Sequence, residues 1–205
     1  GGCATTKSCL RWYGSSSLVV YGCDLRRAVY VGSHSPNDNS VGGTTILFER
    51  CHFQRYSGQV SDFACNLKSG WQQITFRSCF FDRINCLFQP RNNEGEVPGR
   101  DENQHDIEWI NCDFYNTGGQ SINWEHATTL NTPLRQRVQN CRFFGGNSST
   151  NRYLWFKNTS VMTGYVLQGN LFERTNGQNI HRNIAASTDL NFTQYQALTG
   201  ASSEE

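Results

Sequence analysis

The chain carries four carboxylates that could do acid–base chemistry: Asp101, Asp106, Glu108 and Glu125. Glycoside hydrolysis requires two carboxyl groups at a suitable separation, one acting as the acid and the other as base or nucleophile. Glu125 ends an apolar run beside a charged insertion at 90–106, and we single it out as the best catalytic candidate. The simpler alternative is that this insertion is only a solvated loop.

Four further residues could hold a hydroxyl-rich ligand: Asp113, Arg137, Arg142 and Trp155. In the repeat described below, Asp113 faces Arg142 and Glu108 faces Arg137 on neighbouring repeats. These pairs could form an acidic cluster, or simply ion pairs between adjacent strands worth about 0.2–1 kcal/mol each. Trp155 is expected to point outward, where its ring would offer a stacking platform for a sugar.

Arginines occupy another shared slot of the repeat, four positions after its cysteine. They are Arg27, Arg55 and Arg83, with Arg174 further along. Like charges stacked in register repel each other, so neighbouring carboxylates must offset them. A solvated corner is the simpler interpretation, and a groove for acidic sugars is the alternative.

These residues belong to a repeat that reads apolar–x–apolar–x–x–Cys–x–Phe, seen most clearly at 46–53. Six residues fill its cysteine slot, at spacings of 28, 28, 33, 29 and 29: Cys23, Cys51, Cys79, Cys112, Cys141 and Asn170. Self-similarity at such a period is typical of a solenoid or of a propeller.

The repeat predicts strands, because its apolar residues lie two positions apart and so share one face. The two-residue step before the cysteine indicates a bend between two short strands, and each repeat adds a second apolar run, such as Phe63, Cys65 and Leu67. No repeat contains a convincing amphipathic helix, and a propeller blade needs about 40–50 residues. We therefore predict an all-β, right-handed parallel β-helix solenoid of about six to seven coils, each of roughly 28 residues.

Three regions follow from this pattern. Residues 1–17 fit the template poorly and are expected to be a partial first coil or the remnant of an upstream region. Residues 18–186 are expected to form the parallel β-helix. Residues 187–205 form the tail, where Ser187 or Thr188 could cap a short helix that starts at Asp189 and stops at Gly200.

The composition excludes two classes of partner. The formal net charge is +1 and only 17% of residues are charged, so binding to nucleic acid through charge alone is not expected. No apolar run approaches the roughly 18 residues of a membrane-spanning helix. Membrane insertion is therefore not expected.

Nine cysteines raise the question of disulfides or a metal site. No Cys-x-x-Cys pair occurs, and Cys51, Cys79, Cys112 and Cys141 share one slot. Stacked in register, they would lie about 4.8 Å apart inside the core and behave as small apolar residues. We expect buried free thiols and no metal or other cofactor. That separation also permits one or two disulfides, which is the alternative.

The tail reads Tyr195 followed by Gln-Ala-Leu-Thr-Gly, after a series of Cys/Asn-x-Phe coils. This combination resembles the end of many right-handed parallel β-helix repeat proteins, in the pectate-lyase-like and phage tailspike-like group. Tyr195 stands where tryptophan is usual. The resemblance implies a polysaccharide or surface glycan as ligand and an extracellular or virion-surface location.

The signatures of individual enzymes in that group are absent. The chain lacks the Gly-Asp-Asp, Gly-His-Gly and Arg-Ile-Lys motifs of polygalacturonases and the Arg-x-Pro-x-x-Arg element of pectate lyases. Those activities therefore cannot be carried over to residues of this chain.

Three functions are consistent with these observations. The first is a glycan-binding surface or tailspike-like protein, with or without depolymerisation of a host polysaccharide. The second is a secreted polysaccharide lyase or hydrolase, and the third is a non-catalytic structural spike or adhesin segment. Whether the protein is an enzyme stays open. A coil stack ends in unpaired strand edges, so a homo-trimer or a longer chain is expected.

Overall fold

A computed structural model describes most of the repeated segments, and the structural statements below concern those residues. They are 10–12, 17–26, 29–31, 45–54, 63–67, 73–88, 106–115, 120–124, 136–145, 152–156, 165–173, 181–183 and 188–190. All regular elements in this described part are β-strands, and it contains no helix. The all-β prediction is therefore confirmed there.

The strands form three sheets, which we name A, B and C. Sheet A has the order β1 (Leu10–Trp12), β4 (Val29–Val31), β7 (Phe63–Leu67), β10 (Asn85–Phe88), β13 (Gln120–Trp124), β16 (Arg152–Phe156), β19 (His181–Asn183) and β20 (Thr188–Leu190). Sheet B has the order β17 (Tyr165–Gln168), β14 (Gln136–Gln139), β11 (Asp106–Ile110), β8 (Gln73–Arg77), β5 (Thr45–Glu49) and β2 (Leu18–Tyr21). Sheet C has the order β18 (Leu171–Phe172), β15 (Arg142–Phe144), β12 (Asp113–Tyr115), β9 (Phe80–Asp82), β6 (His52–Gln54) and β3 (Asp24–Leu25).

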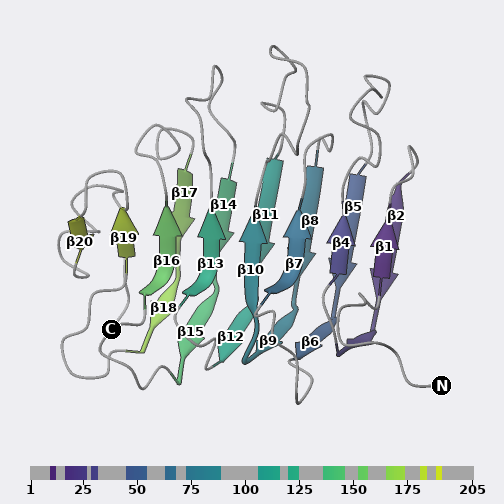
Figure 1. The fold of residues 1–205 in the computed structure, drawn as a ribbon, viewed down its shortest axis with the longest axis horizontal. Coiled ribbons are helices and arrows are strands. Elements are labelled where there is room, and N and C mark those ends of the chain that lie inside the picture. The colour runs from purple at the N-terminus through teal and green to yellow at the C-terminus, as the bar shows by residue number, and fades with distance from the viewer. Residues whose placement is uncertain are drawn as a thin grey trace, which may run out of the picture.

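The chain passes through the three sheets in turn, so that up to β19 each strand pairs with the strand three elements further along. All pairs are parallel except β19 with β20. Figure 1 shows the strands side by side along the long axis of the molecule, in the order of the sequence. Parallel strands in stacked sheets are compatible with a parallel β-helix or another solenoid.

One residue makes the bend between each strand of sheet B and the following strand of sheet C. It has a left-handed backbone, with φ between 52° and 63°: Gly22, Arg50, Ser78, Asn111, Asn140 and Gly169. Its N–H donates to the carbonyl at the end of the next strand in sheet B, as Asn111 N does to Gln139 O at 2.9 Å. The hydrogen-bond ladder therefore continues through the bend, which offsets the roughly 1–2 kcal/mol that this conformation costs a residue other than glycine.

The residue after each bend is the cysteine of the repeat. Cys51, Cys79, Cys112 and Cys141 are buried and are free thiols, as predicted. Each thiol donates to a carbonyl of the preceding coil, and all four Sγ–O distances are 3.4 Å. Asn170 continues the column: its Nδ2 donates to Val138 O at 2.7 Å, and its Oδ1 accepts from Cys141 N at 2.9 Å.

Phenylalanines two residues after the slot form a second inward column, also as predicted. Adjacent rings lie parallel, with centroids 4.6–4.8 Å apart: Phe53, Phe81, Phe114, Phe143 and Phe172. The rings of Phe48, Phe76 and Trp109 form a neighbouring stack on sheet B. Strands stacked about 4.8 Å apart place equivalent rings at stacking distance, so the repeat itself builds the core.

The second apolar run of each repeat forms sheet A. Cys86 of β10 lies in register with Cys65 of β7 and with Ile122 of β13, and Ile122 lies in register with Leu154 of β16. Ile122 and Leu154 are fully buried. The second apolar run of each of these repeats therefore forms a strand of sheet A.

The chain end differs from the prediction. Residues 188–190 form β20, antiparallel to β19, where the sequence predicted the first turn of a helix capped by Ser187 or Thr188. Pairing with β19 gives hydrogen-bond partners to backbone groups at the edge of sheet A. This gain outweighs the local preference of these residues for a helix N-terminus. At the other end, Leu10–Trp12 pair in register with Val29–Val31 as the first strand of sheet A. Residues 191–205 lie outside the described part, and the division into 1–17, 18–186 and 187–205 stays a prediction.

Replacing Phe114 with alanine should lower the free energy of unfolding by about 3–5 kcal/mol, because the ring is fully buried between two others. Urea unfolding followed by far-UV circular dichroism measures this. Leu171→Ala is the control: its side chain is exposed, and a change within about 0.5 kcal/mol is expected. Equal losses in the two variants would contradict the described core.

Alkaline pH should destabilise the protein through the thiol column. The hydrogen bond with the Cys112 thiol, together with burial, raises the pKa of Cys79 from 9.0 to about 12. Because the folded state holds the proton more tightly, this contribution to stability is complete below about pH 9 and is lost as the pH rises toward 12. The free energy of unfolding in urea should therefore fall between pH 9 and pH 11, and fall less in Cys79→Ala. Identical slopes for the two proteins would show that this thiol is not linked to folding.

Candidate functional site

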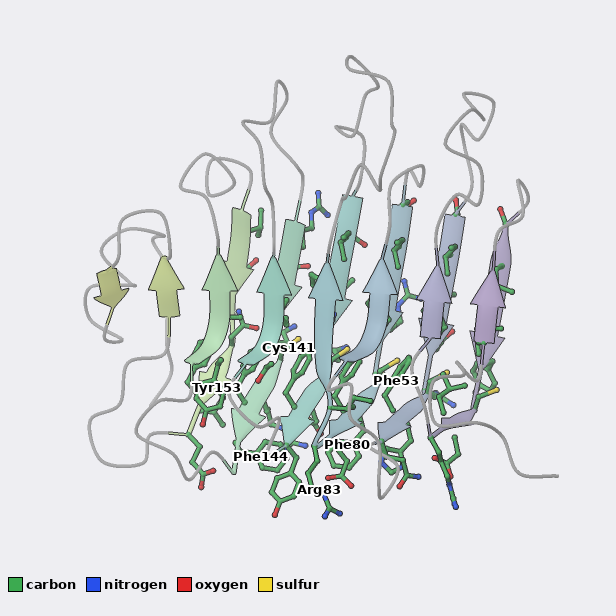
Figure 2. The ribbon with its side chains drawn as sticks, in the orientation of Figure 1. Phe53, Phe80, Arg83, Cys141, Phe144 and Tyr153 are labelled. Carbon is green, nitrogen blue, oxygen red and sulfur yellow. The ribbon has the colours of Figure 1, made fainter. Side chains whose placement is uncertain are left out.

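The outer face of sheet C carries several ion pairs and aromatic contacts between neighbouring strands. On each strand the middle residue points inward and its two neighbours point outward. The first outward position forms one column in register: Asp24, His52, Phe80, Asp113, Arg142 and Leu171. The second column runs Gln54, Asp82, Tyr115 and Phe144. In Figure 2, Phe80, Arg83 and Phe144 project from this face at the lower edge of the molecule.

An ion pair and a ring pair lie side by side on β12 and β15. Arg142 donates through Nε to Asp113 Oδ1 at 2.6 Å and through Nη2 to Asp113 Oδ2. This two-pronged contact raises the pKa of Arg142. The rings of Tyr115 and Phe144 are 5.2 Å apart and tilted by 43°, and the Arg142 guanidinium lies 5.8 Å from the centre of the Phe144 ring. The Asp113–Arg142 ion pair, which we call the polar fork, and the two aromatic rings therefore lie together on the outer face of sheet C.

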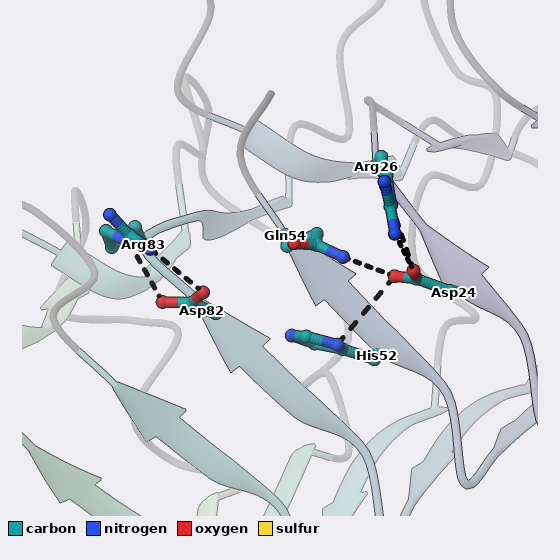
Figure 3. A network of polar contacts seen from close by, with 6 residues as sticks. All are labelled: Asp24, Arg26, His52, Gln54, Asp82 and Arg83. Atoms are coloured by element: carbon teal, nitrogen blue, oxygen red, sulfur yellow. Dashed lines mark hydrogen bonds and ion pairs between the residues drawn. The ribbon is translucent and has the colours of Figure 1, made fainter. Parts of the chain in front are cut away.

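A second polar group lies at the N-terminal end of the face, on β3 and β6 (Figure 3). Asp24 accepts hydrogen bonds from Gln54 Nε2 at 2.5 Å and from Arg26 Nε at 2.9 Å, and these two contacts lower the pKa of Asp24. His52 Nδ1 is 3.7 Å from Asp24 Oδ1. The Asp24 carboxylate therefore has several partners and stays ionised.

The His52 imidazole is not accessible to a substrate as a general base. Its ring stacks on Phe80 with centroids 5.0 Å apart, and its Nε2 atom is buried and has no hydrogen-bond partner. A substrate could not reach that nitrogen without moving the ring. The imidazole serves here as an apolar surface in line with Phe80.

A third ion pair stands near the middle of the face. Arg83, at a bend with φ 55°, donates to the carboxylate of Asp82 through Nε at 3.1 Å and Nη2 at 3.4 Å, and this contact raises the pKa of Arg83. Its counterparts in the proposed arginine column, Arg27 and Arg55, lie outside the described residues. Arg83 itself is paired rather than free, as the solvated-corner interpretation expects.

The outer face of sheet B carries one group predicted from the sequence. Glu108 lies 3.4 Å from Arg137 Nη1 through Oε1, and its Oε2 accepts from Thr75 Oγ1 at 3.4 Å. Thr75, Glu108 and Arg137 are in register on three adjacent strands. Both expected pairs, Glu108 with Arg137 and Asp113 with Arg142, are therefore present. They lie on different sheets, on either side of the bend at Asn111.

The side chains of the remaining candidates lie outside the described part. Asp101 and Glu125 are not among the described residues, and Asp106 and Trp155 are described only as backbone, in β11 and β16. The catalytic roles of Asp101, Asp106, Glu108 and Glu125, and the sugar-stacking role of Trp155, stay predictions.

The sequence interpretation missed the second outward column of sheet C. Tyr115 and Phe144 were not singled out, although they lie two residues after Asp113 and Arg142, which were. Strand periodicity from the cysteine slot would have placed them on the same face. The aromatic part of this surface was therefore available in the sequence.

Three comparisons with known proteins bear on identity: no protein-family model, no curated protein and no solved structure matches the chain. Among the described residues, no group of His, Cys, Asp and Glu is arranged to hold a metal ion, and no helix is long and apolar enough to cross a membrane. An argument for function therefore rests on the geometry of the two outer faces.

The catalytic assignment can be tested by removing charge without changing shape. Glu125→Gln and, separately, Glu108→Gln should each abolish release of reducing ends from a cleaved glycan if these groups act as acid and base. Arg137→Gln is the matched control, since it breaks the same ion pair as Glu108→Gln but leaves the carboxyl group in place. Glycan cleavage that survives both glutamine substitutions undiminished would refute the assignment.

Proposed function

We propose that this protein is a right-handed parallel β-helix of about six to seven coils that binds a glycan along the outer face of sheet C. The chain contributes one strand to each of the three sheets in turn, and this repeated order supports a helical coil. Connections between parallel strands of one sheet are right-handed in about 98% of cases, which supports the hand. A surface or tailspike-like protein, extracellular or on a virion and trimeric or part of a longer chain, is the setting that we propose for it.

The adjoining polar fork and ring pair on β12 and β15 carry this proposal. Binding sites for small polar molecules combine apolar surface with a few fixed hydrogen-bonding groups. Tyr115 and Phe144 supply ring surface that a sugar can cover, and Tyr115 is about 39% exposed. Asp113 and Arg142 supply acceptors and donors that hold each other in a fixed geometry, so less side-chain entropy is lost when a ligand binds.

The shape of the face suits a linear polymer. Six strands of sheet C lie in register, and parallel strands are about 4.8 Å apart, so the columns extend over about 24 Å. Rings and ion pairs recur along this length, from the Asp24 group through Phe80 and Asp82 to Phe144. A strip of this length can contact several sugar units in succession.

Binding is better supported than cleavage. Glu108 and Asp113 are each engaged by an arginine of the next coil. The oxygens of both carboxylates are therefore engaged by neighbouring side chains. Depolymerisation, with Asp101, Asp106, Glu108 and Glu125 as its candidate acid and base, is a second step beyond the binding proposed here.

Phe144→Ala should weaken glycan binding about tenfold, because it removes one ring of the pair and the apolar surface beside Arg142. Glycan arrays identify the ligand, and isothermal titration calorimetry on the best member measures the dissociation constant. Val166→Ala, an exposed apolar residue on the outer face of sheet B, is the control and should bind like the original protein. Absence of any glycan binding, or equal weakening in both variants, would contradict the proposed site.

A further inference from the structure

Every described guanidinium at the outer face of sheet C is already held by a carboxylate. Arg26 contacts Asp24 at 2.9 Å, Arg83 contacts Asp82 at 3.1 Å, and Arg142 contacts Asp113 through two nitrogens. The three pairs stand on β3, β9 and β12–β15, so they are distributed along the whole face. None of these arginines is left as an unpaired positive charge for an anionic ligand.

The described face consequently has no positive excess. Four carboxylates, those of Asp24, Asp82, Asp113 and Glu173, stand against the three guanidiniums. With histidine left aside, this part of the surface carries one net negative charge. Attraction of polyanions depends on clustered unpaired cations, and the arrangement here offers none.

The geometry of the pairs also discriminates between ligands. Arg142 and Arg83 each use Nε and Nη2 on the carboxylate, which leaves Nη1 to donate to a ligand. Sugar hydroxyl groups can both accept from that nitrogen and donate to the carboxylate oxygens, so they can join the pair without breaking it. A sugar carboxylate would have to displace the aspartate, which would then stand without its partner beside a second negative charge. Such unpaired groups are how sites reject the wrong ligand.

The aromatic rings of this face can bind charged and uncharged sugars alike. The Tyr115–Phe144 pair and the stacked rings of His52 and Phe80 offer apolar surface at two places between the ion pairs. Pyranose rings present C–H faces to such surface whether or not they carry an acid group. The rings therefore supply affinity, and the ion pairs determine which sugars are accepted.

We infer that the outer face of sheet C selects neutral, hydroxyl-rich glycans and rejects uronic-acid polymers. The inference rests on the proposed glycan-binding function and specifies its ligand class. Arg83, the one residue of the arginine slot that the structure describes, is paired as the solvated-corner interpretation expects.

The test compares polymers that differ only in charge. Polygalacturonate, alginate and hyaluronan are each paired with their carboxyl-reduced forms, in which the acid group is a hydroxymethyl group and the linkages are unchanged. Dissociation constants are measured by titration calorimetry at 50 and 500 mM NaCl. We expect at least one reduced polymer to bind tenfold or more tightly than its acidic parent, with less than a twofold change over this salt range.

The outcomes separate the inference from the function on which it rests. Tighter binding of the acidic forms, weakened by salt, would overturn the inference and leave glycan binding in place. Binding of no member in either form would overturn the proposed function itself.

A pair of variants tests the proposed cause. Asp113→Asn frees the Arg142 guanidinium, so binding of an acidic polymer should rise tenfold or more and become sensitive to salt. Glu49→Gln makes the same change of charge on the outer face of sheet B and should leave selectivity unchanged. Circular dichroism shows whether each variant is folded. If folded Asp113→Asn gains no affinity for the acidic polymers, the ion pairs do not set the ligand class.

Discussion

The whole architecture depends on one buried side chain at each bend between sheets B and C. A bend of a single left-handed residue turns main-chain groups into the core, where an unsatisfied N–H or C=O costs about 1–3 kcal/mol. The residue after the bend supplies the partner. The Cys112 thiol donates to Phe76 O. Asn170, two repeats further along, donates in the same way to Val138 O and also accepts from Cys141 N. Cysteine is thus a hydrogen-bonding group here as well as a small apolar one.

The column of buried cysteines and Asn170 determines the register of the strands, and the register determines which side chains face outward. A strand that slipped by one residue would move its inward side chains to the outer face, and the thiol would lose its carbonyl. With the register held, Phe53 stacks on Phe81 inside, and Asp113 meets Arg142 outside. The arrangement of the outer face of sheet C is therefore a consequence of the core, since each outward column has the same spacing as the inward one. A surface made in this way is rigid, because its side chains stand on paired strands rather than on loops.

The sequence was most informative where side chains are buried. The slots of Ile46, Phe48, Cys51 and Phe53 predicted inward positions that are almost completely buried, because strand periodicity and a shared template leave little choice of register. The left-handed bend residues were not predicted, although four of the six are glycine or asparagine, which adopt this conformation most readily. At Arg50 and Ser78 the residue type gives no such signal, and the hydrogen-bond ladder on either side imposes the conformation. The strand at Thr188 was missed for the same reason, since an available sheet edge overrode a local helix signal. On the surface, the repeat spacing predicted the ion pairs. The contact between the Tyr115 and Phe144 rings was recognised only in the structure, where their strands are neighbours.

The most direct test of this account compares two replacements of one buried thiol, Cys112→Asn and Cys112→Val, by urea unfolding. Asparagine, which can donate to the same carbonyl as Asn170 does to Val138 O, should lower the free energy of unfolding by less than about 1 kcal/mol, whereas valine, similar in size but without a donor, should lower it by about 1–3 kcal/mol. If the slot were merely apolar, valine would be tolerated and asparagine would be costly. A valine variant as stable as the original protein, or more stable than the asparagine variant, would contradict the claim that this column holds the bends together.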